Sequence, residues 1–268
     1  MRAWSRPWAL LAYTACMACM ASATEPTGGP PQGTLFIVGG GRMTQLWPVF
    51  LELAGGKDSP IVVIPTANDT VEASDPSVLA LRLLGATRVT QLHTRDPQLA
   101  DTAEFAAPLR SARAVWLTGG RQWRLADAYL HTRTLREMVA VLERGGVVGG
   151  SSAGASIQAS YLVRGSPQGN TIMMARTHEQ GFAFLRNSAI DQHVNTRQRA
   201  DDLRPVLQAH PGLLGIALDE ATAIVVNADL CRVLGAGVVR FFPTPSAPPI
   251  VLTAGARFNL LERRGLAP

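Results

Sequence analysis

The stretch VVGGSSAGAS, from Val147 to Ser156, places a short apolar run directly before paired glycines and two adjacent serines. A short continuous apolar run between turn residues is typical of a strand that is buried on both faces. Glycine lets the backbone bend sharply after such a strand, because it has no Cβ atom. We therefore expect a buried strand over 147–150, a tight turn, and then the start of a helix.

The same pattern recurs through the first half of the chain, where short apolar runs alternate with helical stretches. Buried strands are expected within TLFIVGG (34–40), PIVVIPTAND (60–69), TRVTQLHT (87–94) and RAVWLTGG (113–120). Helices are expected within DPSVLALRLLGA (75–86), DPQLADTAEFAAPLRSA (96–112) and, as one or two helices, RQWRLADAYLHTRTLREMVAVLERGG (121–146). In the first of these helices Asp75 can cap the start, Pro76 suits the first turn and Gly85 ends it. Buried strands separated by helices indicate a mostly parallel α/β sheet that is covered by helices on both faces.

The last third of the chain has a different pattern. Strand-like runs between Gly212 and Pro243 are broken by the turn sequences NAD and GAG. Such runs are typical of antiparallel hairpins, and we expect these strands at the edge of the parallel sheet. The sequence contains no internal repeat and no second domain boundary, so we predict a single α/β domain over 34–268.

A leader precedes this domain. Its start carries two arginines and no acidic residue, and an apolar run from Trp8 to Met20 follows. The sequence Ala21-Ser22-Ala23 then fits the small-residue pattern of a cleavage site. We interpret residues 1–23 as a signal peptide that is cleaved after Ala23, with a Pro/Gly-rich linker over 24–33. The mature protein is therefore expected in the periplasm or outside the cell.

Two features of the leader bear on the mature protein. The apolar run is shorter than the roughly 20 residues that a membrane span needs, so no stable span is expected. Cys16 and Cys19 leave a lipid-anchored form as an alternative, although the residues before them fit that signal poorly. Removal of the leader leaves Cys231 as the only cysteine, so the mature monomer can form no internal disulfide.

Composition and motifs exclude several classes of function. The 268 residues are 47% hydrophobic and 17% charged, with no block of like charges, which is typical of a folded domain. The net charge of +5 comes partly from the leader and forms no basic stripe, so no nucleic-acid partner is expected. The turn GGGRMT lacks the later glycine of a dinucleotide site, and THEQGF lacks the second histidine of a zinc motif. We therefore expect no metal and no cofactor.

The turn after the opening strand is a candidate for catalysis. Gly150 to Gly154 fits the pattern G-x-S-x-G between a strand and a helix. In that context small neighbours allow a strained turn that projects the central serine above the sheet, so Ser152 is a candidate nucleophile. A developing oxyanion would be held by backbone N–H groups, for which we choose Ala153 and Gly120 of the turn at 119–120. The alternative is a glycine-rich turn without a catalytic role, in which the small residues are needed only for packing.

A serine nucleophile needs a base, and the chain has five histidines. His131 and His210 fall within helical patterns, where an ordinary surface or core position is the simpler interpretation. His93 ends a predicted strand and stays open as a candidate. His193 is favoured, because an apolar lead and then a dense cluster of polar residues surround it in AIDQHVNTRQRADDL (189–203).

Four segments together resemble the signature of a known family. They are LTGGRQWRL (117–125), GGSSAGAS (149–156), IDQHVNTRQR (190–199) and GIALDEATAIVV (215–226), and they are similar to those of cyanophycinase and its relatives, the S51 serine peptidases. The resemblance implies a flavodoxin-like α/β fold, similar to that of class I glutamine amidotransferases but with a serine at the turn. An amidotransferase would need a cysteine there.

The resemblance also implies serine exopeptidase chemistry. Ser152 matches the family nucleophile and His193 the family base, and the reaction would be acyl transfer through Ser152. The positions that match the family's substrate pocket are Gln122, Asp191, Gln192, Arg197 and Arg199. A substrate that carries both guanidinium and carboxylate groups suits such a mixture of arginine and aspartate.

The chain departs from the family in two places. Asp202 stands where the family carries a third arginine, which weakens one predicted contact to a substrate carboxylate. The family's catalytic acid falls between the serine and the histidine, but Tyr161–Thr177 contains no acidic residue. We choose Glu179 for this role, since it is the nearest acid before the histidine segment. The alternatives are Asp191, Asp219, Glu220 and, without a charge, Asn170.

The resemblance predicts an exported serine exopeptidase of the cyanophycinase type. Its substrate would be cyanophycin, a poly-aspartate chain with arginine on each side-chain carboxylate, and its products would be β-Asp-Arg dipeptides. Two alternatives stay open: an aspartyl or isoaspartyl dipeptidase, and a non-catalytic binding protein that retains the pocket. The expected partner is a peptide or polymer substrate, and a homodimer is one assembly that the chain could form.

Overall fold

The computed structural model describes residues 26–267. The predicted signal peptide, its cleavage site after Ala23 and the cysteines Cys16 and Cys19 lie outside the described residues. Within the part that the structure describes, no helix is long and apolar enough to span a membrane.

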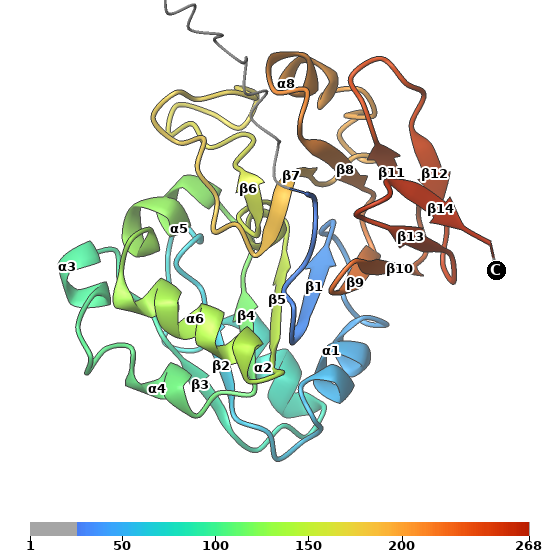
Figure 1. Cartoon of the computed structure of the whole chain (residues 1–268). Coiled ribbons are helices and arrows are strands. Elements are labelled where there is room, and N and C mark those ends of the chain that lie inside the picture. The colour runs from blue at the N-terminus through green and yellow to red at the C-terminus, as the bar shows by residue number, and fades with distance from the viewer. Residues whose placement is uncertain (1–25, 268) are drawn as a thin grey trace, which may run out of the picture.

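Residues 26–267 form two sheets, and the larger has nine strands and a parallel centre (Figure 1). In spatial order the strands are β14 (Arg264–Leu266), β13 (Arg257–Asn259), β10 (Leu230–Gly235), β9 (Thr222–Asn227), β1 (Thr34–Val38), β5 (Val147–Ser151), β4 (Ala114–Leu117), β2 (Ile61–Ile64) and β3 (Val89–Gln91). The five strands from β1 to β3 in this order run parallel, whereas β9, β10, β13 and β14 pair antiparallel. The predicted α/β class, with a parallel core and antiparallel strands near the C-terminus, is confirmed.

A second sheet of five strands was not expected from the sequence. Its strands are β12 (Ile250–Leu252), β11 (Val239–Phe242), β8 (Leu214–Leu218), β7 (Leu185–Asp191) and β6 (Ala159–Tyr161). Strands β8 and β9 are neighbours in sequence, yet they belong to different sheets. The chain crosses between the sheets at 219–221, where Ala221 takes a φ of +53°. A strand pattern shows that a strand forms, but it does not show which strand becomes its partner.

The helices predicted within 75–86 and 121–146 form, whereas the helices at 47–53 and 204–209 were not predicted. They are α1 (Trp47–Leu53), α2 (Pro76–Leu83), α3 (Pro97–Ala100), α4 (Ala107–Arg110), α5 (Gln122–Tyr129), α6 (Arg133–Glu143), α7 (Ala153–Ser156) and α8 (Arg204–Ala209). Asp75 caps α2 by accepting from the backbone N–H of Ser77 at 2.7 Å. The single helix expected over 96–112 is instead the two short helices α3 and α4. Thr102 bonds to nearby backbone groups with its hydroxyl, and Pro108 cannot continue a helix from the residues before it.

Helices cover both faces of the larger sheet. Since alternate residues of a strand point to opposite sides, each central strand contributes side chains to two core clusters. In β1, Leu35 and Ile37 join the core cluster that includes α5 and α6. Phe36 and Val38 join the cluster that includes α1 and α2. The central strands are therefore buried on both faces, as their uninterrupted apolar runs predicted.

The parallel pairing brings three strand ends together. Ser151 of β5 pairs with Val38 of β1, and Gly150 of β5 pairs with Leu117 of β4. Since carboxyl ends of parallel strands meet at one edge of a sheet, the turns that follow β1, β4 and β5 lie side by side there.

Candidate active site

The turn between β5 and α7 carries Ser152 in a strained conformation. Its φ of +57° and ψ of −113° lie outside the regions that ordinary residues occupy. Glycines allow the surrounding backbone to come close, since a Cβ at Gly150 would lie 2.3 Å from the Gly154 oxygen. One at Gly154 would lie 2.1 Å from the Leu117 oxygen. This is the geometry of a nucleophile elbow, which presents the serine at the edge of the sheet.

His193, which follows β7, lies beside this serine. Its Nε2 is 2.9 Å from Ser152 Oγ, and its backbone N–H donates to the Gly39 oxygen at 2.8 Å. The ring packs against Gly40, where an added Cβ would lie 2.3 Å from the ring's Cε1 and where φ is +105°. The glycine turn after β1 therefore leaves the room that holds the imidazole against the serine.

A carboxylate holds the other side of the ring. Oε1 of Glu220 is 2.5 Å from His193 Nδ1, and it also accepts from Thr196 Oγ1 at 2.9 Å. The backbone N–H of Glu220 donates to Asn195 Oδ1 at 2.9 Å. Ser152, His193 and Glu220 thus form a continuous chain of hydrogen bonds, in which the glutamate is fixed by two further partners.

This geometry corrects the choice of Glu179 as the third residue of the chain. Glu179 lies between β6 and β7, where its carboxylate influences the phenol of Tyr161. Burial is the largest cause that raises the pKa of this phenol, and Glu179 is the next. Glu220, one of the alternatives, holds the ring of His193 instead. The available signal was its position at the end of the predicted strand in GIALDE, since strand ends gather at one edge of a sheet.

The remaining alternatives for the acid are engaged elsewhere. Asp219 Oδ1 accepts from Arg240 Nη1 at 2.8 Å. Asp191 Oδ1 accepts from Arg164 Nε at 2.8 Å, and Nη1 of the same arginine donates to the backbone oxygen of Asn170 at 2.8 Å. These contacts engage the carboxylates of Asp219 and Asp191, whereas the contact of Asn170 is made by its backbone. Both ring nitrogens of His193 are taken by Glu220 and Ser152.

Burial and neighbouring charges set the protonation of the ring and its carboxylate. Loss of solvent lowers the pKa of His193 below its usual value of 6.5, Glu220 opposes this, and Arg197 and Arg199 act with it. The hydrogen bond from His193 lowers the pKa of Glu220. At neutral pH the imidazole is therefore neutral and the carboxylate ionised. In this state Nε2 can accept a proton from Ser152.

We expect the acid limb of the kcat/KM profile to lie below pH 6.5, because burial lowers the pKa of His193 from that value. His193 must be neutral to act as a base, so activity is lost only as the pH falls through this lowered pKa. Arg197→Gln removes a cation near the ring and should move the limb to higher pH. The measurement is kcat/KM on a peptide substrate across the acid range, and a wild-type limb at neutral pH or above would contradict the assignment.

Two backbone N–H groups, one in the turn after β4 and one in the turn after β5, have no hydrogen-bond acceptor in the described part of the chain and are candidates to bind an oxyanion. Within residues 26–267, neither the N–H of Gly120 nor that of Ala153 donates to another protein group. Gly119 lies against the serine, since an added Cβ there would be 3.4 Å from Ser152 Cβ. Gly120 has a φ of +129°, and an added Cβ would lie 2.1 Å from the Ala67 oxygen. The turn after β4 therefore lies beside the turn after β5, as the predicted donor pair requires.

The residues matched to a substrate pocket differ in exposure. Four are buried with at most 6% of the residue exposed, namely Gln122, Asp191, Gln192 and Arg199. The amide of Gln122 donates to the Val163 oxygen at 2.9 Å. Arg197 is the exposed member of the set. No sequence pattern singled out Arg164, a buried residue that contacts Asp191.

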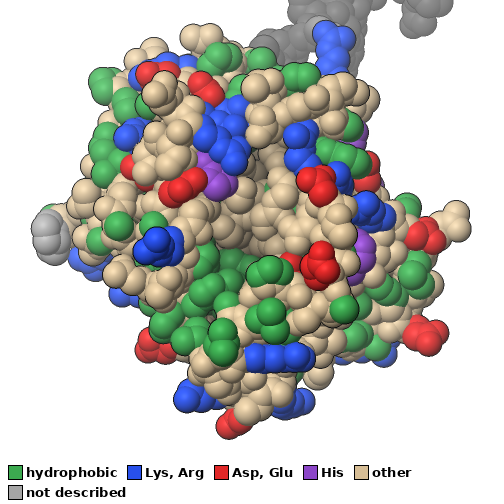
Figure 2. Space-filling view, turned by 180° about the vertical axis from the view of Figure 1, so that it is seen from behind, with side chains coloured by type: hydrophobic (Ala, Val, Ile, Leu, Met, Phe, Trp, Pro, Cys, Tyr) green, Lys and Arg blue, Asp and Glu red, His purple; other side chains and the backbone are tan. Residues whose placement is uncertain are grey.

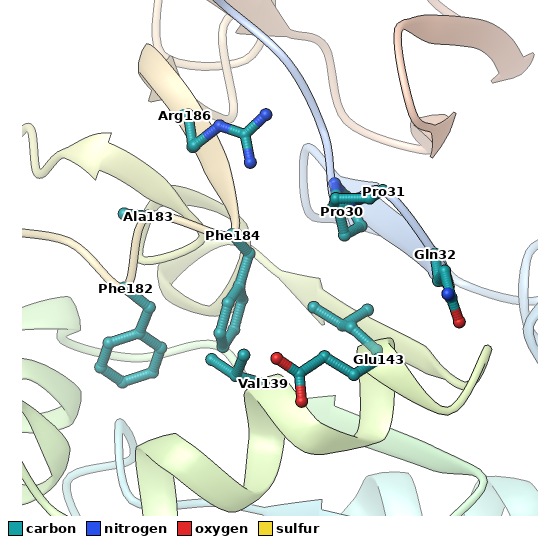
Figure 3. Close-up of a pocket in the computed structure, with 10 residues that line it drawn as sticks. Pro30, Pro31, Gln32, Val139, Glu143, Phe182, Ala183, Phe184 and Arg186 are labelled. Carbon is teal, nitrogen blue, oxygen red and sulfur yellow. The ribbon is translucent and has the colours of Figure 1, made fainter. Parts of the chain in front are cut away.

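Other features of the molecule lie apart from the chain Ser152–His193–Glu220. His93, the second candidate base, is 2.9 Å from Thr66 Oγ1 through its Nδ1. A cavity of about 400 Å³ between Pro30–Gln32, α6 and the segment 182–186 contains none of the three residues (Figure 3). In the described part of the chain, no group of three or more histidine, cysteine, aspartate or glutamate side chains is arranged to hold a metal ion.

Figure 2 shows one face of the molecule with a hollow near its centre. Basic side chains, a histidine and acidic side chains gather around this hollow, and apolar side chains lie below it.

Comparisons with known proteins find a family and several relatives that this chain matches. The sequence model of peptidase family S51 matches residues 35–234. The chain is 29% identical over 228 residues to the cyanophycinase of Trichormus variabilis, which covers 78% of this chain and 74% of the relative. It is 30% identical over 220 residues to the cyanophycinase of Synechococcus elongatus, with 78% and 67% covered.

Solved structures show the same fold. A peptidase from an acI-B1 Actinobacterium superposes with a TM-score of 0.64 at 24% identity, covering 86% of this chain and 98% of the other. A putative peptidase E protein from Listeria monocytogenes superposes with a TM-score of 0.59 at 18% identity, covering 76% and 99%. At these identities the likeness concerns the fold.

Proposed function

Because the chain belongs to peptidase family S51, we propose that it is a serine exopeptidase that works through an acyl-enzyme on Ser152. The observation that carries the proposal is the hydrogen-bonded chain from Ser152 through His193 to Glu220. A nucleophile, a base that can take its proton and an acid that orients the base are the parts that acyl transfer needs.

The proposed reaction assigns each group one role. Ser152 Oγ attacks the carbonyl carbon of the scissile bond while His193 Nε2 takes its proton. Glu220 stabilises the imidazolium that forms, and the N–H groups of Gly120 and Ala153 hold the oxyanion. His193 then gives the proton to the leaving amine. Water, activated by the same histidine, releases the acyl group and restores the serine.

Cyanophycin is the first candidate substrate, with β-Asp-Arg dipeptides as products. The candidate rests on the names of the relatives, which are cyanophycinases at 29% and 30% identity. An aspartyl or isoaspartyl dipeptidase is the second candidate. Here the supporting observation is the pairing of Asp191 with Arg164, which occupies a carboxylate that an arginyl side chain of the polymer would need.

A labelling and substrate screen tests these proposals together. The purified protein should react with a fluorophosphonate probe and release amines from cyanophycin, isoaspartyl dipeptides or aspartyl dipeptides. Activity on small dipeptides alone would remove the polymer assignment and keep the peptidase. A protein that is neither labelled nor active would instead support the binding protein that retains the pocket.

We also propose that the protein acts in the periplasm or outside the cell. The support is the leader, with its charged start, its apolar run and its small-residue site before Thr24. Cell fractionation should recover a chain that begins at Thr24 outside the cytoplasm. A cytoplasmic protein that still carries residues 1–23 would overturn this.

A further inference from the structure

A buried cluster of charged side chains lies directly beside the strand that carries the base. Arg164, in the loop after β6, is 2% exposed, and Asp191, the last residue of β7, is fully buried. The guanidinium meets the carboxylate with two parallel bonds, Nε to Oδ1 at 2.8 Å and Nη2 to Oδ2 at 2.9 Å. Nη2 also donates to Asp202 Oδ2 at 2.5 Å. One internal arginine thus binds two carboxylates, that of Asp191 at the end of β7 and that of Asp202 in the segment after it.

The loop that delivers Arg164 is tied to the opposite side of the active site. Gln122, just after the glycine turn at 119–120, donates to the Val163 oxygen at 2.9 Å. Arg121 Nη2 donates to the Ser166 oxygen at 2.7 Å. The loop therefore spans from the wall with the oxyanion donors to the wall with the base. Arg164 itself takes a φ of +56°, a backbone conformation that residues other than glycine rarely adopt.

Within residues 26–267, this arrangement leaves no carboxylate next to the base with both of its oxygens free to pair with a guanidinium of the substrate. Both oxygens of Asp191 are bound by Arg164, and Asp202 is bound by the same residue. Oε1 of Glu220 is bound by both His193 and Thr196. A substrate guanidinium that pairs with both oxygens of Asp191 would have to displace Arg164, which already binds them with the same geometry.

The two arginines beside the base, Arg197 and Arg199, have fewer contacts with carboxylates than Arg164 has. Arg197 is exposed and forms no ion pair within residues 26–267. Arg199 donates to the Gln192 oxygen at 3.2 Å, and its nearest carboxylate, that of Asp191, is 3.7 Å away. Burial and the charges of Arg164 and Arg197 lower the pKa of Arg199 to about 10, while Asp191 opposes them, so it is still charged at neutral pH. The open charge at this wall is positive, which favours a substrate carboxylate.

We propose that Arg164 is a specificity-determining residue that closes the site to arginyl side chains and leaves Arg197 and Arg199 to bind a carboxylate. The preferred substrates are then peptides whose aspartyl residue, the one that acylates Ser152, keeps its side-chain carboxylate free. This inference rests on the proposed peptidase function and narrows its substrate class.

One end of the Arg164 guanidinium lies next to an exposed side chain. Its guanidinium runs from the fully buried Asp191 to Asp202, whose side chain is 41% exposed. A smaller residue at 164 would therefore open a guanidinium-shaped hole towards solvent at the Asp202 end. Glycine suits the backbone there, because it tolerates the positive φ of this position.

Binding to inactive protein tests the inference without turnover. The probes are two matched peptides, Asp-Asp and the same dipeptide with arginine amide-linked to the side-chain carboxylate of its first residue. Calorimetry with Ser152→Ala should give at least about tenfold tighter binding of the unbranched probe. In Ser152→Ala/Arg164→Gly the preference should shift by about tenfold or more towards the branched probe. Methylguanidinium should refill the hole and reverse that shift, which a merely structural role would not do.

Two further variants serve as a control and as a substitute for Arg164→Gly. Arg136→Gln, which removes a surface ion pair with Asp101, should leave the preference unchanged. If Arg164→Gly does not fold by circular dichroism, Arg164→Lys, which keeps a charge but cannot bridge both oxygens, should show a smaller shift in the same direction.

The outcomes separate the two proposals. Equal binding of both probes to Ser152→Ala, tighter binding of the branched probe, or no binding of either would overturn the role of Arg164. So would a folded Arg164→Gly variant whose preference is unchanged. Fluorophosphonate labelling of the wild-type protein reports the peptidase chemistry independently of each of these results.

Discussion

Replacing Ser152 by alanine is expected to lower kcat by about 10⁶-fold, because the reaction loses the atom that forms the acyl-enzyme. Fluorophosphonate labelling should disappear with it. Substrate binding should stay close to that of the wild type, since Oγ contributes a single contact to a bound peptide. The measurements are steady-state rates on the best peptide substrate and probe labelling detected on a gel.

Ser151 supplies the matched control for this variant. It is the last residue of β5 and pairs with Val38, one position before the strained turn. Ser151→Ala should therefore be labelled and turn over substrate near the wild-type rate. Loss of labelling in Ser151→Ala with retention in Ser152→Ala would show that Ser151, and not Ser152, is the nucleophile.

Replacing Glu220 by glutamine is expected to lower kcat by roughly 10⁴-fold, the loss typical when the acid of a serine triad becomes an amide. The carboxylate stabilises the imidazolium and holds the ring with Nδ1 protonated, whereas an amide can donate to Nδ1 and favour the wrong tautomer. The acid limb of the pH profile should also move to lower pH, because Glu220 raises the pKa of His193.

Glu179→Gln is the control that separates the two glutamates. Its carboxylate acts on Tyr161, away from the imidazole, so its rate and pH profile should match those of the wild type. A large loss in Glu179→Gln with normal rates in Glu220→Gln would contradict the geometry. Thr196→Ala, which removes one of the bonds that fix Glu220, should show a smaller loss than Glu220→Gln.

The parallel core of the fold could be predicted from local patterns. The apolar runs of β1, β4 and β5 are uninterrupted because both of their faces are covered. Asp75 and Pro76 start α2 as predicted, since a cap acts on the first turn of its own helix. The family signature was also accessible, because it consists of short segments whose order along the chain is preserved.

The candidate nucleophile and base were accessible for a related reason. Ser152 lies in a five-residue motif between a strand and a helix, and His193 lies in a polar cluster at the end of a strand. Both signals act over a few residues, and the structure brings the two side chains to 2.9 Å. The choice of Gly120 and Ala153 as oxyanion donors rests on glycine turns at neighbouring strand ends and stays a prediction.

Tertiary structure alone decided the acid and the charge balance of the site. Glu220 and Arg164 are each 27 residues from their partners, His193 and Asp191. Their meeting depends on the crossing of the chain between two sheets and on a loop that spans both walls of the site. Propensity, caps and periodicity act within a turn or a strand, whereas contacts of this kind depend on which strands pair. For that reason the sequence determined the parallel core of the larger sheet and the candidate serine and histidine, and only the folded chain decided which carboxylate contacts the histidine and which is bound by an internal arginine.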